Sequence, residues 1–162
     1  MSASPTAQST TARRPLPLPD ALTTAGAVLA LGCTFVGTYV QTPWKSGPGT
    51  WGLDFGGNGG WTALAVLVAI ATVALMLVGL ATARARTLPP RSTARRALLL
   101  AALGAVAVVV FWTGLPPVLA GGAAGLALDT RRRLGRLPAP AVGALCIAGP
   151  TVAAAIYFAF TG

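Results

Sequence analysis

The sequence predicts an all-α integral membrane protein, a polytopic helical bundle with about five transmembrane helices. Two observations carry this prediction. Hydrophobic residues make up 54% of the 162 residues and charged residues only 9%, well below the roughly 25% that is usual in soluble domains. Several apolar stretches also approach or exceed the ~20 residues with which a helix crosses the hydrocarbon core. We therefore expect one transmembrane helical domain at residues 20–162, preceded at residues 1–19 by a disordered cytoplasmic tail rich in Ser, Thr, Pro and Ala.

Each expected span is bounded by proline, glycine or arginine. Asp20 is placed to cap the first span, and the second is apolar all round, as a lipid-facing helix is. A connector at 84–96 carries five arginines and a Pro-Pro pair, and Ser92 or Thr93 can cap the span after it. Gly114 and two prolines then break that span. The expected spans are residues 21–40, 61–83, 97–113, 115–129 and 140–160, with an outer loop at 41–60.

The number of crossings follows from the order of arginine and aromatic residues. Arginines near span ends mark the cytoplasmic side, and Trp and Tyr favour the interfaces. Arginine blocks (13–14, 84–96 and 131–136) alternate strictly with aromatic blocks (35–61, 111–112 and 157–160). Six alternating blocks predict five crossings, with the N-terminus inside and the C-terminus outside. The arginines expected to set this topology are Arg84, Arg86, Arg95, Arg96, Arg131, Arg132 and Arg133.

The fourth segment is short for a span. Its apolar run, residues 115–128, has fourteen residues and rises about 21 Å against a hydrocarbon core of about 30 Å. Snorkelling arginines or a thinned bilayer could close that gap. Alternatively, residues 97–129 form a re-entrant hairpin that enters and leaves on the cytoplasmic side. Both versions place the C-terminus outside.

The ionisable residues give little support for catalysis. The carboxylates are Asp20, Asp54 and Asp129, and the sequence has no Glu and no His, the usual general acid–base residues. Asp129 lies beside Arg131–Arg133, where an ion pair is expected. We therefore expect a protein that is not an enzyme, with no catalytic residue, cofactor or metal. No ionisable residue falls in the middle of an expected span, which disfavours a proton-coupled carrier.

Partners are predicted from charge and from the outer loop. Topology accounts for the net charge of +9, so we expect contacts with the lipid bilayer and its anionic headgroups and none with nucleic acid. The outer loop holds Trp44, Trp51, Asp54 and Asn58. It is either a recognition loop for an envelope partner or a flexible loop whose tryptophans lie at the interface. One carboxylate with Asn58 falls short of what calcium needs.

Small residues predict close helix packing. The first span presents Gly26, Ala30, Cys33 and Gly37 at helical spacing, and the run AGGAAG contains Gly121 and Gly125 four residues apart. Such small-xxx-small patterns let helix backbones approach closely. They either pack helices within one chain or associate the protein with itself or with another membrane protein.

The run FWTGLPPVLAGGAAGLALDTRRRLGR (111–136), the use of arginine over lysine, and the Ala/Val/Gly/Pro-rich composition resemble small multi-span integral membrane proteins of high-GC actinobacteria. The resemblance implies a multi-pass protein of the bacterial cytoplasmic membrane and transfers no functional residue. We expect a non-enzymatic accessory or structural protein that acts through helix packing and its Gly/Trp-rich outer loop. The alternative is a transport component, either a minimal pore or a permease subunit.

Overall fold

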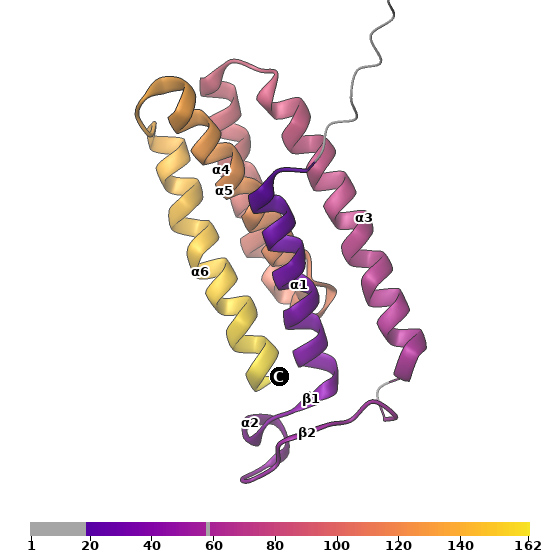
Figure 1. Ribbon diagram of the computed structural model, residues 1–162. Helices are drawn as coiled ribbons and strands as arrows, with labels where there is room; N and C mark the ends of the chain where they lie inside the picture. Colours follow the sequence, from indigo (N-terminus) through magenta and orange to yellow (C-terminus); the bar gives the residue numbers. More distant parts are fainter. Residues whose placement is uncertain (1–18, 58) are drawn as a thin grey trace, which may run out of the picture.

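The computed structural model describes residues 19–57 and 59–162, and within them the chain is an all-α helical bundle (Figure 1). The predicted all-α class is thus confirmed, whereas the expected tail lies almost wholly outside the described residues. The long helices are α1 (Ala21–Tyr39), α3 (Gly60–Arg86), α4 (Pro90–Ala107), α5 (Leu115–Leu134) and α6 (Ala139–Thr161). Shorter elements are β1 (Val40–Gln41), α2 (Pro43–Ser46), β2 (Gly52–Leu53) and the 3-10 helix η1 (Val108–Thr113).

Four helical segments in the described part of the chain are long and apolar enough to cross a membrane: Ala21–Tyr39, Gly60–Arg86, Pro90–Thr113 and Ala139–Thr161. Their exposed side chains are largely aliphatic, with Met76 and Leu77 on α3 and Leu99 and Leu103 on α4 each about 60% exposed. Such surfaces suit a lipid environment, where apolar side chains need no burial. The fold therefore supports a membrane-embedded protein.

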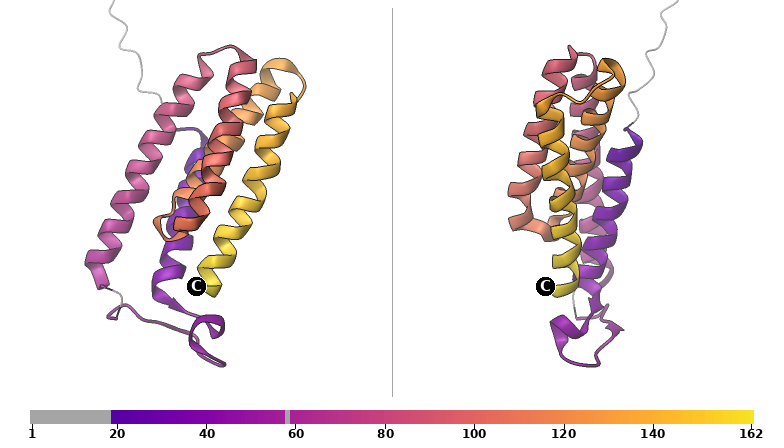
Figure 2. Two further views of the ribbon diagram at one scale, coloured as in Figure 1. Left: turned by 180° about the vertical axis from the view of Figure 1, so that it is seen from behind. Right: turned by 90° about the vertical axis from the view of Figure 1, so that its left-hand side faces the viewer.

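The bundle has two chemically different ends. α1, α4 and α6 run in one direction and α3 and α5 in the other (Figures 1 and 2). One end, here called the arginine-rich end, carries Asp20 and the arginines at 84–96 and 131–136. The opposite, aromatic end carries the segment 40–57 and the C-terminus. The aromatic residues at 111–112 and 157–160 also lie toward that end, where Phe111 stacks on Phe158 at 5.4 Å.

α5 occupies the centre of the bundle. It packs against α1, α3, α4 and α6, and ten of its twenty residues are buried. Val118, Ala123, Leu126 and Ala127 are 0% exposed. Much of the surrounding core is alanine, including Ala94, Ala97, Ala101, Ala141 and Ala144. Such small side chains let helices approach closely, and larger side chains, Leu98 and Ile147 among them, pack against this alanine core.

The structure corrects the expected boundary between the second and third spans. α3 continues to Arg86, and α4 begins at Pro90 instead of residue 97. The expected connector at 84–96 is thus reduced to residues 87–89. Proline is well suited to the first position of a helix, because its missing N–H would have no partner there. Ser92 and Thr93 are therefore not caps but lie inside the first turn of α4.

The fourth long helix extends beyond the expected fourth segment. α5 continues from residue 129 through the three arginines to Leu134, where Gly135 ends it with a φ of 68°. A left-handed glycine is a common helix terminator. The arginines lie in the last turn, where the helix dipole favours positive charge. With 20 residues, α5 rises about 30 Å, but its apolar part is still the fourteen-residue run, and α5 is not among the four segments of the described chain that are apolar enough to cross a membrane.

The turn between α4 and α5 lies short of the aromatic end of α1. After Ala107 the chain tightens into η1 and reverses at Gly114, whose φ is 72°. A β-carbon at Gly114 would lie 3.0 Å from Thr34 Oγ1 and 3.3 Å from the Ala30 β-carbon. Thr34 lies five residues before Tyr39, the last residue of α1. The α4–α5 turn therefore lies about 7 Å short of the end of α1 along the helix axis.

Candidate functional site

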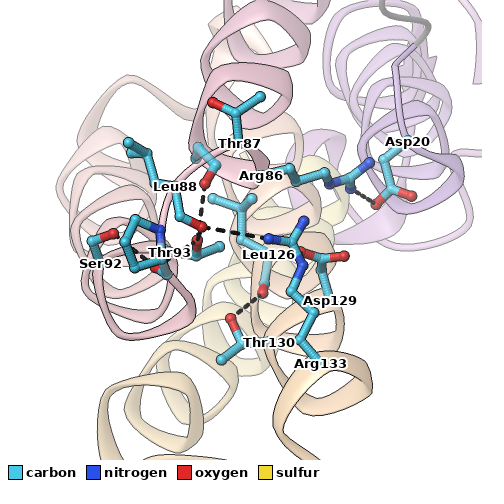
Figure 3. A network of polar contacts seen from close by, with 12 residues as sticks. Asp20, Arg86, Thr87, Leu88, Ser92, Thr93, Leu126, Asp129, Thr130 and Arg133 are labelled. Atoms are coloured by element: carbon cyan, nitrogen blue, oxygen red, sulfur yellow. Dashed lines mark hydrogen bonds and ion pairs between the residues drawn. The ribbon is translucent and has the colours of Figure 1, made fainter.

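Asp20 connects the start of α1 to the end of α3. Its carboxylate oxygen Oδ2 lies 2.9 Å from Arg86 Nη2 (Figure 3). Asp20 is the residue before α1, as expected, but its side chain makes no capping bond within the described residues. The prediction of a side-chain cap is therefore wrong. A guanidinium partner offers a charge-assisted contact that is stronger than a neutral amide bond.

The expected ion pair of Asp129 is confirmed, and its partner is Arg133. Asp129 Oδ2 lies 2.9 Å from Arg133 Nε, four residues later on α5. The same oxygen accepts no aligned hydrogen bond from the described residues, so charge and proximity hold the pair together. Arg133 also donates from Nη1 to the carbonyl of Leu88, 3.4 Å away (Figure 3). The end of α5 is thereby fastened to the α3–α4 turn.

Thr93 closes the α3–α4 turn from inside. Its buried hydroxyl donates to the carbonyl of Ala85 at 2.9 Å, and the carbonyls of Pro89 and Leu88 lie 3.3 and 3.5 Å from it (Figure 3). The last carbonyls of a helix have no partner within the helix. The Thr93 hydroxyl supplies a hydrogen-bond partner for one of the last carbonyls of α3. The Thr93 side chain is therefore buried and does not lie at an exposed cap position.

Three of the predicted packing glycines lie in the contact between α1 and α5. A β-carbon at Gly121 would lie 3.2 Å from the Gly26 α-carbon and 3.3 Å from the Leu22 carbonyl carbon. A β-carbon at Gly125 would overlap the Asp20 carboxylate. These glycines therefore make contacts within one chain, one of the two roles expected for them.

The other predicted packing residues of α1 are dispersed. Ala30 is fully buried near the α4–α5 turn. A β-carbon at Gly37 would lie 3.8 Å from the Ala159 α-carbon on α6, an ordinary contact. Cys33 is a half-buried free cysteine. The predicted stripe on α1 thus faces different neighbours along its length.

The outer loop expected at 41–60 contains a short hairpin. β1 and β2 pair antiparallel, with Val40 opposite Leu53 and Gln41 opposite Gly52. Asp54 holds the hairpin: its Oδ2 accepts from Gln41 Nε2 at 3.2 Å, and its Oδ1 accepts from the Gly57 amide at 2.9 Å. Both oxygens of the Asp54 carboxylate thus accept hydrogen bonds from other residues of the loop. Asn58, the other predicted polar residue, lies outside the described residues.

Two buried side chains attach the hairpin to the helices. Tyr39 is 0% exposed, donates its hydroxyl to the Gly60 carbonyl at 2.9 Å, and stacks on Phe55 at 4.7 Å. Thr42, also 0% exposed, donates to the Phe160 carbonyl at 2.6 Å. The first contact joins the end of α1 to the start of α3, and the second joins the hairpin to the end of α6.

Lys45 completes the attachment. Its ammonium donates to the carbonyls of Gly37 at 2.9 Å and Val36 at 3.3 Å, in the last turn of α1, where a cation is favoured by the helix dipole. Burial lowers the pKa of Lys45 below its ordinary value. The sequence contained no signal for this role, because the lysine is brought to α1 only by the fold of the hairpin.

Trp44 and Trp51 remain exposed on this anchored hairpin. They are 66% and 64% exposed, and their rings meet edge to face at 6.1 Å. Together with Tyr157 and Phe160 of α6 they line an open hollow of about 540 Å³. The aromatic end therefore presents large aromatic side chains on a hairpin tied to three helices.

Comparisons of the chain with protein-family models, curated proteins and solved structures found no match. Among the described residues, no group of three or more His, Cys, Asp or Glu side chains is placed to hold a metal ion.

Proposed function

We propose that the protein is a non-enzymatic accessory or structural component of a bacterial cytoplasmic membrane, acting through helix packing and its exposed hairpin. The observation that carries the proposal is the position of α5. This helix, which is rich in glycine and alanine, fills the centre of the bundle. A pore through the bundle would have to pass through that space.

The distribution of polar groups supports the same role. The ion pairs Asp20–Arg86 and Asp129–Arg133 lie at the arginine-rich end, while the buried core between the two ends consists mainly of alanine. Proton relays and ion paths in membranes use ionisable side chains inside the spans. A bundle with an alanine core is suited to stable packing rather than to conduction.

The exposed hairpin is the surface proposed to contact another membrane or envelope protein. Tryptophan and tyrosine are enriched among residues that dominate binding energy at protein interfaces. Trp44 and Trp51 are held on a hairpin fixed by Tyr39, Thr42 and Lys45. Because the hairpin is already ordered, little conformational entropy would be lost when a partner binds.

The role can be tested with a photo-reactive amino acid placed at Trp44 and, as a matched control, at Leu77. Both positions are more than 60% exposed, but Leu77 lies on the apolar face of α3. Irradiation of cells should yield an adduct of discrete mass with one protein at position 44 and lipid adducts alone at position 77. The purified protein in liposomes should conduct small neutral solutes no faster than empty liposomes. Solute flux together with lipid adducts alone at position 44 would favour a transport component instead.

We also propose that the bundle crosses the membrane five times, with the arginine-rich end inside and Gly162 outside. Arginine at span ends favours the cytoplasmic side, and α5 runs along the bundle in the direction opposite to α4 and α6, as a returning crossing would. The α4–α5 turn carries Trp112, 55% exposed, which suits an interface.

Topology can be measured at two positions. Alkaline phosphatase fused after Gly162 should be active, and a fluorescent protein fused there should be dark. In a variant with Cys33 and Cys146 replaced by alanine, Trp112→Cys should react with an impermeant thiol reagent from outside, though more slowly than the loop control Gly49→Cys. Full protection of Trp112→Cys would favour the re-entrant hairpin, and an inactive phosphatase would contradict the orientation.

A further inference from the structure

The surface between α1, α5 and α6 contains an apolar groove. It has a volume of about 410 Å³ and is lined by leucine, alanine, glycine, proline and valine side chains of the three helices. Its floor is the face of α5 that carries Pro117, Gly121 and Ala124. Such a volume falls within the ~300–1,000 Å³ range of sites for small molecules.

The groove continues into a charged region at the arginine-rich end. Leu22 lines both the apolar groove and a small hollow of about 180 Å³ that also contains Asp20, Arg86 and Asp129. Leu128 and Arg132 in turn line both that hollow and an open one of about 450 Å³ with Arg131 and Gly135. The three hollows are thus neighbours in a row, here called the track, which is apolar along the helices and cationic at its end.

The net charge at the cationic end comes from two arginines. Asp20 is paired with Arg86, and Asp129 with Arg133. Arg131 and Arg132 are exposed and have no ion-pair partner in the part of the chain that the structure describes. The two carboxylates near the track are therefore balanced, and two guanidinium groups remain available for an anion. Guanidinium groups bind phosphate oxygens through parallel N–H bonds.

The dimensions fit one leaflet of a bilayer. From Pro117 to Leu128 the floor of the track covers twelve residues of α5, which rise by about 17 Å. Half of a hydrocarbon core of about 30 Å is about 15 Å. A lipid tail lying along the groove would therefore place its headgroup at the level of Arg131 and Arg132.

We propose that this track is a binding site for one anionic glycerophospholipid. An acyl chain lies in the groove between α1 and α6, and the phosphate contacts Arg131 and Arg132. The site does not depend on the accessory role or on the direction in which the bundle is inserted. The proposal gives Arg131 and Arg132 a role in binding a ligand, in addition to their expected influence on topology.

Lipid titration followed by native mass spectrometry tests the cationic end. The detergent-purified full chain should bind phosphatidylglycerol more tightly than phosphatidylcholine with the same acyl chains. Arg131→Gln/Arg132→Gln should weaken phosphatidylglycerol binding by roughly tenfold or more and abolish the preference. Arg91→Gln/Arg95→Gln, which removes the same charge from exposed positions on α4, should leave it unchanged. Equal losses in the two variants, or no preference in the unmodified protein, would overturn the proposal.

The groove is tested by filling it. Gly149 lines the groove on α6, and a β-carbon there would meet open space among the described residues. Gly149→Leu should therefore fold normally and weaken the binding of both lipids, whereas Gly32→Leu on an open face of α1 should not. A phosphatidylglycerol with a photo-reactive tail should label the segments 117–128 and 145–152. Labelling confined to α3 and α4 would overturn the site. So would a shift from dimer to monomer in Gly149→Leu with lipid binding retained, which would place a second copy in the groove.

Discussion

Replacing Gly121 with valine is expected to lower the free energy of unfolding by about 3 kcal/mol. Its β-carbon would lie 3.2 Å from the α-carbon of Gly26 and 3.3 Å from the carbonyl carbon of Leu22. Both are backbone atoms and cannot rotate away, so α1 must move off α5. Gly26→Val should act in the same way, because its β-carbon would lie 3.3 Å from the Gly121 α-carbon. Reversible unfolding in mixed micelles measures the loss.

Gly32→Val is the matched control for these two substitutions. Gly32 lies in the interior of α1, as Gly26 does, but its β-carbon would meet open space among the described residues. Its effect should stay within about 0.5 kcal/mol, as for other surface substitutions. If Gly32→Val lost as much stability as Gly121→Val, the cause would be the introduction of valine into a helix. The close approach of α1 and α5 would then not be responsible.

Tyr39→Ala is expected to destabilise the protein by about 3 kcal/mol or more. Tyr39 is among the largest fully buried side chains of the described residues. Its ring contacts Phe35 at 5.4 Å and Phe55 at 4.7 Å, and its hydroxyl binds the Gly60 carbonyl. The substitution opens a cavity where α1, the hairpin and α3 meet. Thermal unfolding followed by near-ultraviolet circular dichroism reports the loss.

Two variants separate the parts of this effect. Tyr39→Phe keeps the ring and removes one hydrogen bond, so it should lower the free energy of unfolding by about 1 kcal/mol. Tyr157→Ala removes a tyrosine that is 63% exposed and should cost less than Tyr39→Ala. A similar loss for Tyr157→Ala and Tyr39→Ala would contradict the placement of Tyr39 at the centre of the aromatic end.

The helical class could be predicted from the sequence because it depends on composition and on the length of apolar runs. Both are properties of the chain before it folds. The approximate positions of the helices followed for the same reason, and prolines and glycines marked most of their ends. At residues 84–96 and after residue 129 the structure differs from the prediction, because the arginines there lie inside α3, α4 and α5. Arginine is a good helix former, so charge marks the limit of the apolar region but not the limit of the helix.

The candidate site could be predicted only in part. Small residues in the first span and in the AGGAAG run indicated close packing, but spacing alone does not reveal which helix faces which. Thr93, Thr42 and Lys45 bind carbonyls on other elements. Such contacts join residues as far apart as Thr42 and Phe160 and leave no periodic pattern in the sequence.

The sequence by itself determined that this chain forms apolar helices with arginine at one end and aromatic residues at the other. Local propensity and the partitioning of side chains between water and lipid suffice for that outcome. Only the tertiary structure decided that α5, a long helix that is not among the four segments apolar enough to cross a membrane, lies at the centre. Hydropathy reports which helices can face lipid, whereas a central helix is selected by how closely its glycines and alanines let four neighbours approach.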